Sequence, residues 1–187
     1  MVVVESCHSL TLVLGPARSG KSRWAEHLAI QSGLPVTYLA TGPQPTADDA
    51  TWLARVEAHV VRRPPHWGFL EVDSALAAAL DTLSPPGLAL VDSLGTWVAA
   101  GLDLDSSAWQ QRCTELLESL RNCRVTVLLV SEQTGWGVVP ATAIGGLFRD
   151  RLGSLEQQLA PFCGAIWLVV AGRALNLTNL GLAIPAT

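Results

Sequence analysis

The stretch Gly15-Pro16-Ala17-Arg18-Ser19-Gly20-Lys21-Ser22 constrains the fold more than any other part of the sequence. It matches the pattern G-x-x-x-x-G-K-[ST], follows the apolar run from Leu10 to Leu14 and leads into a helix-like segment from Arg23 onward. Strand, glycine-rich loop and helix in this order form the context in which such a loop binds phosphate. The pattern therefore predicts a P-loop near the start of an α/β domain.

The residue types in this loop explain the expected chemistry. Gly15 and Gly20 allow tight turns that point backbone N–H groups at one anion, and the positive N-terminal end of the following helix adds to the attraction. Lys21 is expected to reach the β- and γ-phosphates, and the hydroxyl of Ser22 to bind Mg²⁺. A glycine-rich turn that binds nothing is the alternative, which the complete motif and its flanks disfavour. The motif does not indicate which nucleotide binds or what receives the phosphate.

Length and composition limit the architecture and the class of partner. The chain has 187 residues, which predicts a single domain over residues 1–187, with residues 1–9 as a loosely ordered N-terminal extension. Hydrophobic residues make up 49% and charged residues 15%, so much of the chain is expected in a core or in subunit contacts. No apolar run reaches the roughly 18 residues that span a bilayer. A net charge of −4 argues against nucleic-acid binding.

The cysteines and the N-terminus bear on the compartment. Cys7, Cys113, Cys123 and Cys163 form no C-x-x-C pair, so they are predicted to be reduced and mostly buried thiols. The first residues lack a basic segment followed by an apolar one, so we expect a cytoplasmic protein.

The segment from Thr46 to Arg63 predicts a helix over about residues 47–62, capped by Thr46 and ended by Pro64-Pro65. One face carries apolar side chains, and a second face carries a histidine among arginines: Arg55, His59 and either Arg62 or Arg63. Guanidinium groups could hold phosphate oxygens, and a neutral imidazole could attack phosphorus. The alternative is a solvated polar face with an ordinary histidine, and spacing alone favours that alternative.

Polar groups follow several predicted strands. Thr41 and Gly42 follow the strand from Val36 to Ala40, and a glycine-rich loop, residues 132–140, follows the strand from Arg124 to Ser131. The apolar strand from Leu88 ends in Asp92, as in a Walker-B strand whose carboxylate holds Mg²⁺, although Asp92 could instead cap the next helix. Ligands bind beyond the carboxyl ends of parallel strands. These signals predict an α/β, P-loop NTPase-like three-layer fold with a mainly parallel central sheet and helices on both faces.

Four motifs in this order resemble one known family. They are G-x-A-R-S-G-K-S-R, R-V-x-x-H-x-x-x-R-P-x-x-W, the acid-ended strand, and V-S-x-x-x-G-x-G-V-V-P followed by F-R-D-x-x-G. Together they resemble the bifunctional adenosylcobinamide kinase and adenosylcobinamide-phosphate guanylyltransferase of cobalamin biosynthesis, from about Leu10 to Leu177. The resemblance implies that ATP or GTP first phosphorylates adenosylcobinamide. GTP then guanylylates a histidine, and the GMP passes on to give adenosylcobinamide-GDP.

The resemblance also implies roles for particular residues. The guanylylated histidine would be His59, with Lys21 and the rest of Gly15 to Ser22 at the phosphates. Glu71 and Asp92 match acidic positions of the family's guanine-nucleotide site, and a carboxylate suits guanine because it accepts hydrogen bonds from N1–H and the 2-amino group. Residues that would flank the nucleotide are Ala40, Thr41, Gly42, Val60, Val61, Arg62 and Arg63. Ser22 and Asp92 would hold Mg²⁺, and the protein would be a homotrimer that binds a corrinoid and no membrane.

The chain departs from the family pattern at three places. Val60 and Val61 stand where a basic residue is common, Glu132-Gln133 replaces the usual N-E pair, and Glu156 replaces an asparagine. These departures bear on the kinase half of the activity. Two other functions remain open: a P-loop kinase of a small metabolite that makes a single phosphoryl transfer, and a nucleotide-binding regulatory protein that has lost turnover.

Overall fold

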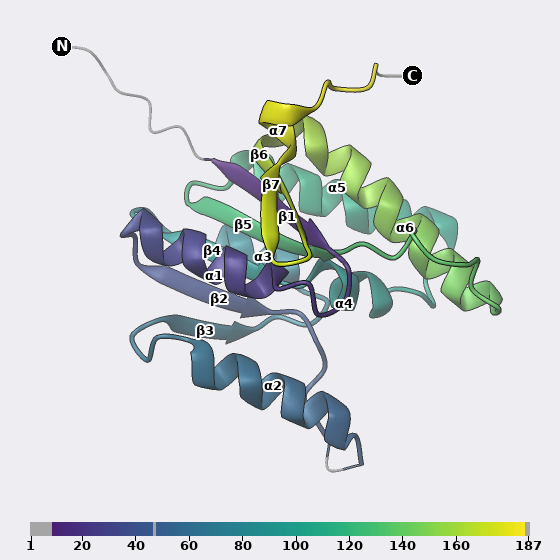
Figure 1. Ribbon diagram of the computed structural model, residues 1–187, viewed down its shortest axis with the longest axis horizontal. Coiled ribbons are helices and arrows are strands. Elements are labelled where there is room, and N and C mark those ends of the chain that lie inside the picture. Colours follow the sequence, from purple (N-terminus) through teal and green to yellow (C-terminus); the bar gives the residue numbers. More distant parts are fainter. Residues whose placement is uncertain (1–8, 47, 186–187) are drawn as a thin grey trace.

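The computed structural model describes residues 9–46 and 48–185, which form one seven-stranded sheet with helices on both faces (Figure 1). The spatial order is β3-β2-β4-β5-β1-β6-β7, and all neighbouring strands are parallel except the antiparallel pair of β6 and β7. The predicted fold class is confirmed. The predictions for residues 1–8 and for Cys7 lie outside the described residues.

The strands are short, and most lie where the sequence predicts them. They are β1 (Leu10–Gly15), β2 (Val36–Ala40), β3 (Gly68–Glu71), β4 (Leu88–Asp92), β5 (Thr126–Glu132), β6 (Cys163–Val170) and β7 (Arg173–Asn176). Strand β5 lies between β1 and β4, so the ends of the P-loop strand, the Asp92 strand and β5 reach the same edge of the sheet.

Seven helices complete the described fold, and they include the two predicted after the P-loop and before Pro64-Pro65. They are α1 (Lys21–Ser32), α2 (Ala50–Arg62), α3 (Leu76–Asp81), α4 (Leu94–Ala99), α5 (Ser106–Asn122), α6 (Ala143–Leu159) and α7 (Leu177–Leu180), with a 3₁₀ turn at Ala160–Phe162. Helix α2 begins later than predicted, because the carboxylate of Asp49, not Thr46, accepts the hydrogen bond of a first-turn N–H, that of Trp52. Helix α7 is not apparent in the sequence pattern.

The sheet separates two layers of apolar packing. Leu12 and Leu14 of β1 belong to a core that also contains Leu76, Trp97, Leu116 and Leu155 from α3, α4, α5 and α6. Val13 points to the opposite face and packs with Ala25 and Ala29 of α1. This alternation follows from the two-residue repeat of a strand, and both faces are covered as in other parallel sheets.

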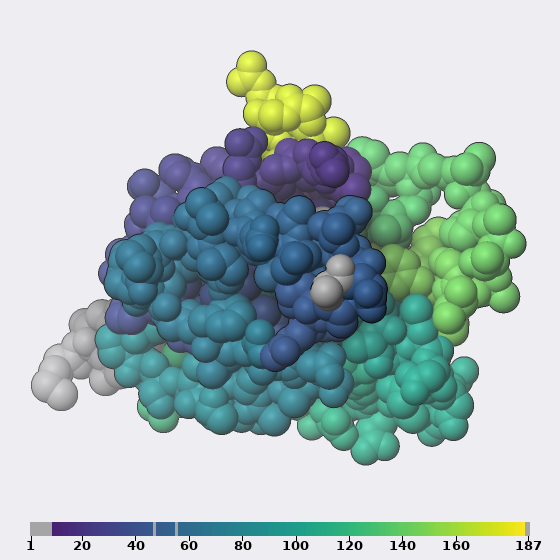
Figure 2. Space-filling model, turned by 90° about the horizontal axis from the view of Figure 1, so that it is seen from below, coloured from purple at the N-terminus to yellow at the C-terminus, as the bar shows by residue number. Residues whose placement is uncertain are grey.

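Helix α2 lies apart from both cores. It is placed outside the edge strand β3 (Figure 1), and its blue surface lies near the centre of the face seen in Figure 2. Polar contacts at three of its residues connect it to the rest of the protein. Arg62 donates to both carboxylate oxygens of Glu26 in α1, at 3.2 and 3.1 Å, the indole of Trp52 donates to the Pro43 carbonyl at 2.9 Å, and His59 contacts the sheet. Helix α2 is therefore positioned by polar contacts more than by buried apolar area.

Two smaller predictions can also be compared with the structure. Cys113 and Cys123 are buried and Cys163 is half-buried, and all three are free thiols. Among the described residues, no helix combines the length and the apolar character needed to cross a membrane.

Candidate active site

The predicted P-loop connects β1 to α1 in the conformation that its glycines allow. Gly20 precedes α1 at φ 95°, and a Cβ on Gly15 would lie 2.5 Å from the backbone oxygen of Val169 and 2.5 Å from the Ser19 hydroxyl. Both positions therefore need glycine, one for its backbone angle and one for close packing. Lys21, at the first position of α1, is 4% exposed. Residues 18–23 line a cavity of about 730 Å³, whose opposite wall is α2.

A second cavity, of about 320 Å³, opens on the other side of His59. Its lining is rich in aromatic side chains, including Tyr38, Trp52 and Phe69, and also carries the carboxylate of Glu71. We call the first cavity the P-loop cavity and the second the aromatic cavity. His59 lines both of them, so the imidazole stands where a phosphate-binding space meets a space suited to a planar ring.

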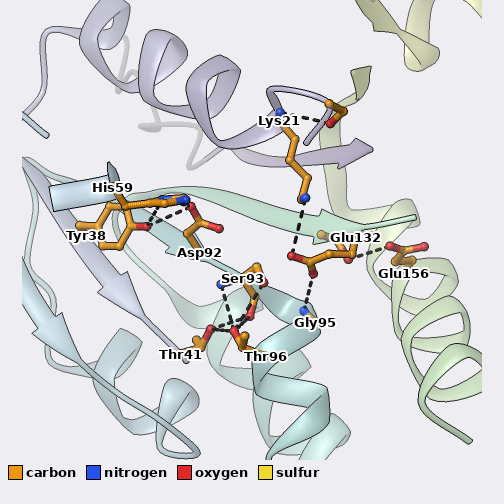
Figure 3. Close-up of polar contacts among 12 residues, drawn as sticks. Lys21, Tyr38, Thr41, His59, Asp92, Ser93, Gly95, Thr96, Glu132 and Glu156 are labelled. Atoms are coloured by element: carbon orange, nitrogen blue, oxygen red, sulfur yellow. Dashed lines mark hydrogen bonds and ion pairs between the residues drawn. The ribbon is translucent and has the colours of Figure 1, made fainter. Parts of the chain in front are cut away.

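The His59 ring is oriented from one side. Its Nδ1 atom lies 3.3 Å from Oδ2 of Asp92 and 3.3 Å from the hydroxyl of Tyr38, and that hydroxyl donates to the same Asp92 oxygen at 2.9 Å (Figure 3). Because Tyr38 uses its proton on Asp92, both contacts of Nδ1 are satisfied when Nδ1 carries the hydrogen. The lone pair of the neutral ring is then on Nε2, which is free to act as a nucleophile.

The carboxylate of Asp92 is kept ionised by its neighbours. Burial alone would raise its pKa, but the hydrogen bond from His59, the charge of that imidazole when it is protonated, and hydrogen bonds from Tyr38 and Ser22 outweigh burial and hold the pKa below its ordinary value. Asp92 does not cap the helix that follows, because Ser93 takes that position. Because Ser22 hydrogen-bonds to Asp92, the two predicted Mg²⁺ ligands lie next to each other at the carboxyl edge of the sheet.

The two predicted arginines lie on the walls of the cavities that His59 borders, Arg62 in the P-loop cavity and Arg63 in the aromatic cavity, and each also has a partner of its own. Arg62 pairs with Glu26, and the guanidinium of Arg63 lies 4.3 Å from the ring centre of Tyr38 and 4.4 Å from that of Phe69. A buried carboxylate, not a guanidinium, is therefore the charge next to His59. The side chain of Arg55 lies outside the described residues.

Most of the remaining predicted residues lie on a cavity wall or at the edge of the sheet. Ala17, Ala40, Gly42 and Glu71 line the aromatic cavity, and the amide of Gln44 donates to Glu71 at 2.6 Å. Thr41 is fully buried, and its hydroxyl bonds to the Ser93 carbonyl and to Thr96. It therefore stabilises the edge of the sheet and does not face a ligand.

Val60 and Val61 are 53% and 85% exposed and are not part of either cavity wall. Pro16 is half-exposed and also lies outside both cavity walls.

Two site residues were missed as candidates. Tyr38 orients Asp92 and His59, and the carboxylate of Glu132 lies 3.8 Å from the Lys21 ammonium while accepting the N–H of Gly95 at 2.9 Å. The sequence offers a signal for both. Tyr38 is the chain's one tyrosine, placed in a strand, and Glu132 ends the strand that lies beside the P-loop strand.

The family of the chain follows from comparison with known proteins. The family described as "Cobinamide kinase / cobinamide phosphate guanyltransferase" matches residues 11–177, a range that holds both cavities and all of the residues above. The chain belongs to this family. As a cobinamide kinase and cobinamide phosphate guanyltransferase, it takes part in adenosylcobalamin biosynthesis, and the predicted resemblance and activities are confirmed.

Curated relatives align over almost their whole length. The "Bifunctional adenosylcobalamin biosynthesis protein CobP" of Pseudomonas aeruginosa is 41% identical over 168 residues, covering 89% of this chain and 95% of that protein. The protein CobU of Escherichia coli K12, described in the same words, is 34% identical over 183 residues, covering 90% and 99%.

Solved structures extend the likeness at the level of the fold. An ATPase from the type III secretion system of pathogenic bacteria superposes with a TM-score of 0.52 at 9% identity, covering 94% of this chain and 59% of that one. This likeness concerns the fold alone.

Proposed function

We propose that this cobinamide kinase and guanyltransferase transfers GMP through a covalent bond to His59 Nε2, and that Gly15 to Ser22 hold the triphosphate for both of its reactions. The observation that carries the proposal is the position of His59, which borders the P-loop cavity and the aromatic cavity with Nδ1 tied to Asp92. A nucleotide with its phosphates in the first cavity and its base in the second would pass the Nε2 atom.

In the guanylylation step, the lone pair of Nε2 attacks the α-phosphorus of GTP. The bond from that phosphorus to the bridging oxygen breaks, and pyrophosphate leaves with the electron pair. The ring then carries positive charge, which the adjacent Asp92 carboxylate stabilises through Nδ1–H. In the second step a phosphate oxygen of cobinamide phosphate attacks the same phosphorus, and the P–N bond returns its electrons to Nε2.

Guanine recognition is assigned to Glu71. Asp92 uses Oδ2 for His59 and Tyr38, which leaves Oδ1 for a metal ion, whereas Glu71 lies on the wall of the aromatic cavity and bonds to Gln44, an exposed amide that a base could replace. The carboxylate of Glu71 would accept from N1–H and the 2-amino group of guanine, neither of which adenine offers. The kinase step would use ATP or GTP.

The donors fit Mg²⁺ of the kind that P-loop enzymes use. The described residues contain no group of three or more His, Cys, Asp or Glu side chains that could hold a metal ion, so Ser22 and Asp92 would share the ion with phosphate oxygens and water. When bound, the ion would neutralise charge on the phosphates. The homotrimer and the cytoplasmic location predicted from the sequence belong to this proposal too.

Incubation with α-labelled GTP tests the covalent step. We expect a stable mass increase of one GMP less water on the intact protein, which acid or hydroxylamine removes. His59→Ala should abolish it. His66→Ala is the matched control, since His66 is exposed, lies outside both cavity walls and should not affect the label. If the wild-type protein forms adenosylcobinamide-GDP but never carries the GMP label, the covalent route is contradicted.

A further inference from the structure

Glu132 lies beside the P-loop because of the strand order. Glu132 pairs in register with Gly15, the last residue of β1, and the N–H of Gln133 donates to the Gly15 carbonyl at 2.9 Å. Because β5 separates β1 from β4, its end lies between the loop that holds Lys21 and the strand that ends in Asp92. The backbone of Glu132 thus lies between the P-loop, which is expected to hold the triphosphate, and the end of β4, which is expected to hold the metal ion.

The two oxygens of this carboxylate have different partners. Oε2 accepts the backbone N–H of Gly95 at 2.9 Å, which fixes the group, and Oε1 lies 3.8 Å from the Lys21 ammonium (Figure 3). Lys21 is 4% exposed and Glu132 is 21% exposed and lines the aromatic cavity. The Oε1 atom therefore faces the lysine that would contact the terminal phosphate, on a side chain that also borders the aromatic cavity.

Neighbouring carboxylates are already engaged. Asp92 accepts from Tyr38 and contacts His59, while Glu156 accepts from the Ser131 hydroxyl at 2.7 Å and from the Gln133 amide at 2.9 Å. Of Asp92, Glu132 and Glu156, Glu132 is the one with an oxygen that faces Lys21.

We propose that Glu132 is the general base of the kinase reaction. As the substrate hydroxyl oxygen bonds to the γ-phosphorus, its proton passes to Oε1 of Glu132, and the γ-phosphorus separates from the β–γ bridging oxygen, which leaves with the electron pair on the nucleoside diphosphate. Before the triphosphate binds, Glu132 neutralises the buried Lys21. The phosphates then attract Lys21 and free Oε1. This role rests on the proposed binding of triphosphate by the P-loop.

The guanylyl transfer has no comparable need, because its acceptor is a phosphate oxygen that already carries negative charge. The two half-reactions should therefore separate when Glu132 loses its charge. Glu132→Gln keeps an oxygen that can accept the Gly95 N–H, so the loop geometry is expected to survive. We expect phosphorylation of cobinamide to slow roughly 100- to 10,000-fold, while guanylylation of the protein and GMP transfer to supplied cobinamide phosphate stay near wild-type rates.

Two further measurements separate proton transfer from positioning. Affinity for ATP in Glu132→Gln should be unchanged or tighter, because Lys21 has lost a competing carboxylate. Gly95→Ala keeps Glu132 but its added Cβ would collide with that carboxylate, so it should also slow the kinase reaction selectively in a folded protein. Glu118→Gln removes an exposed carboxylate on α5 and should match wild type in both reactions.

Three results would overturn the proposal: a wild-type kinase rate in Glu132→Gln, an equal loss of both half-reactions, or a loss of ATP affinity in proportion to the lost rate. Failure of the P-loop assignment has a different signature, since Lys21→Ala would then bind ATP as wild type does.

Discussion

At the scale of single residues, the site depends on one hydrogen-bonded series from Tyr38 through Asp92 to His59. Burial, with the nearby Asp92 charge, raises the pKa of Tyr38 well above its ordinary value, so its hydroxyl remains a donor at any working pH. The sequence motif locates His59 and Asp92 but not their contact, because residues on different elements meet only through the fold. The arginines nearest in sequence line the two cavities, whereas the charge in contact with the ring is that of Asp92.

Removing the Tyr38 hydroxyl should therefore slow guanylylation. Tyr38→Phe deletes a hydrogen bond to a charged group, a type worth about 1.5–3 kcal/mol, so we expect a roughly ten- to hundredfold lower rate of single-turnover GMP labelling. Phenylalanine keeps the ring that Arg63 covers, so GTP affinity should change little, while the lost hydrogen bond should lower the melting temperature by a few degrees. An unchanged labelling rate would mean that Asp92 alone orients His59.

At the scale of elements, the buried strands and their helices were predictable, and the exceptions have physical causes. The predicted end of α2 agrees because Pro64-Pro65 stops the helix, but its start was misplaced because Asp48, Asp49 and Thr46 are all acceptable caps in sequence. Only the hydrogen bond from Trp52 to Asp49 decides among them. The strand from Arg124 to Ser131 was predicted, yet the place of β5 next to β1, which makes Glu132 important, is a property of the sheet order.

Helix α2 should be locally sensitive to its cap. Asp49→Ala removes the side-chain acceptor, at a cost of about 1 kcal/mol. Because α2 packs outside the two cores, we expect faster hydrogen exchange within residues 50–62 and slower GMP labelling, with little change in global stability. Asp105→Ala deletes the equivalent cap of α5, a helix buried in the main core, and should lower the melting temperature without accelerating exchange in α2. If both variants lower the melting temperature equally and accelerate hydrogen exchange throughout the protein, the prediction that the Asp49 cap affects α2 alone is contradicted.

At the scale of the whole molecule, the resemblance to the family implies a homotrimer, which would cover exposed apolar surface. Large apolar side chains such as Val138, Leu182 and Ile184 are 96%, 98% and 78% exposed, in line with the high hydrophobic fraction of the sequence. We predict a homotrimer of about 59 kDa, three times the 19.8 kDa chain, in size-exclusion chromatography with light scattering. A mass of one chain at all concentrations would contradict this prediction.

The shared position of His59 has a kinetic consequence. A GMP bonded to Nε2 would extend across the wall between the two cavities and leave no room for a second triphosphate in the same orientation. Phosphorylation and guanylyl transfer would then alternate within one subunit instead of running at the same time. The relative supply of GTP and of the two corrinoid substrates, rather than the speed of either chemical step, would decide which reaction occupies the enzyme at a given moment.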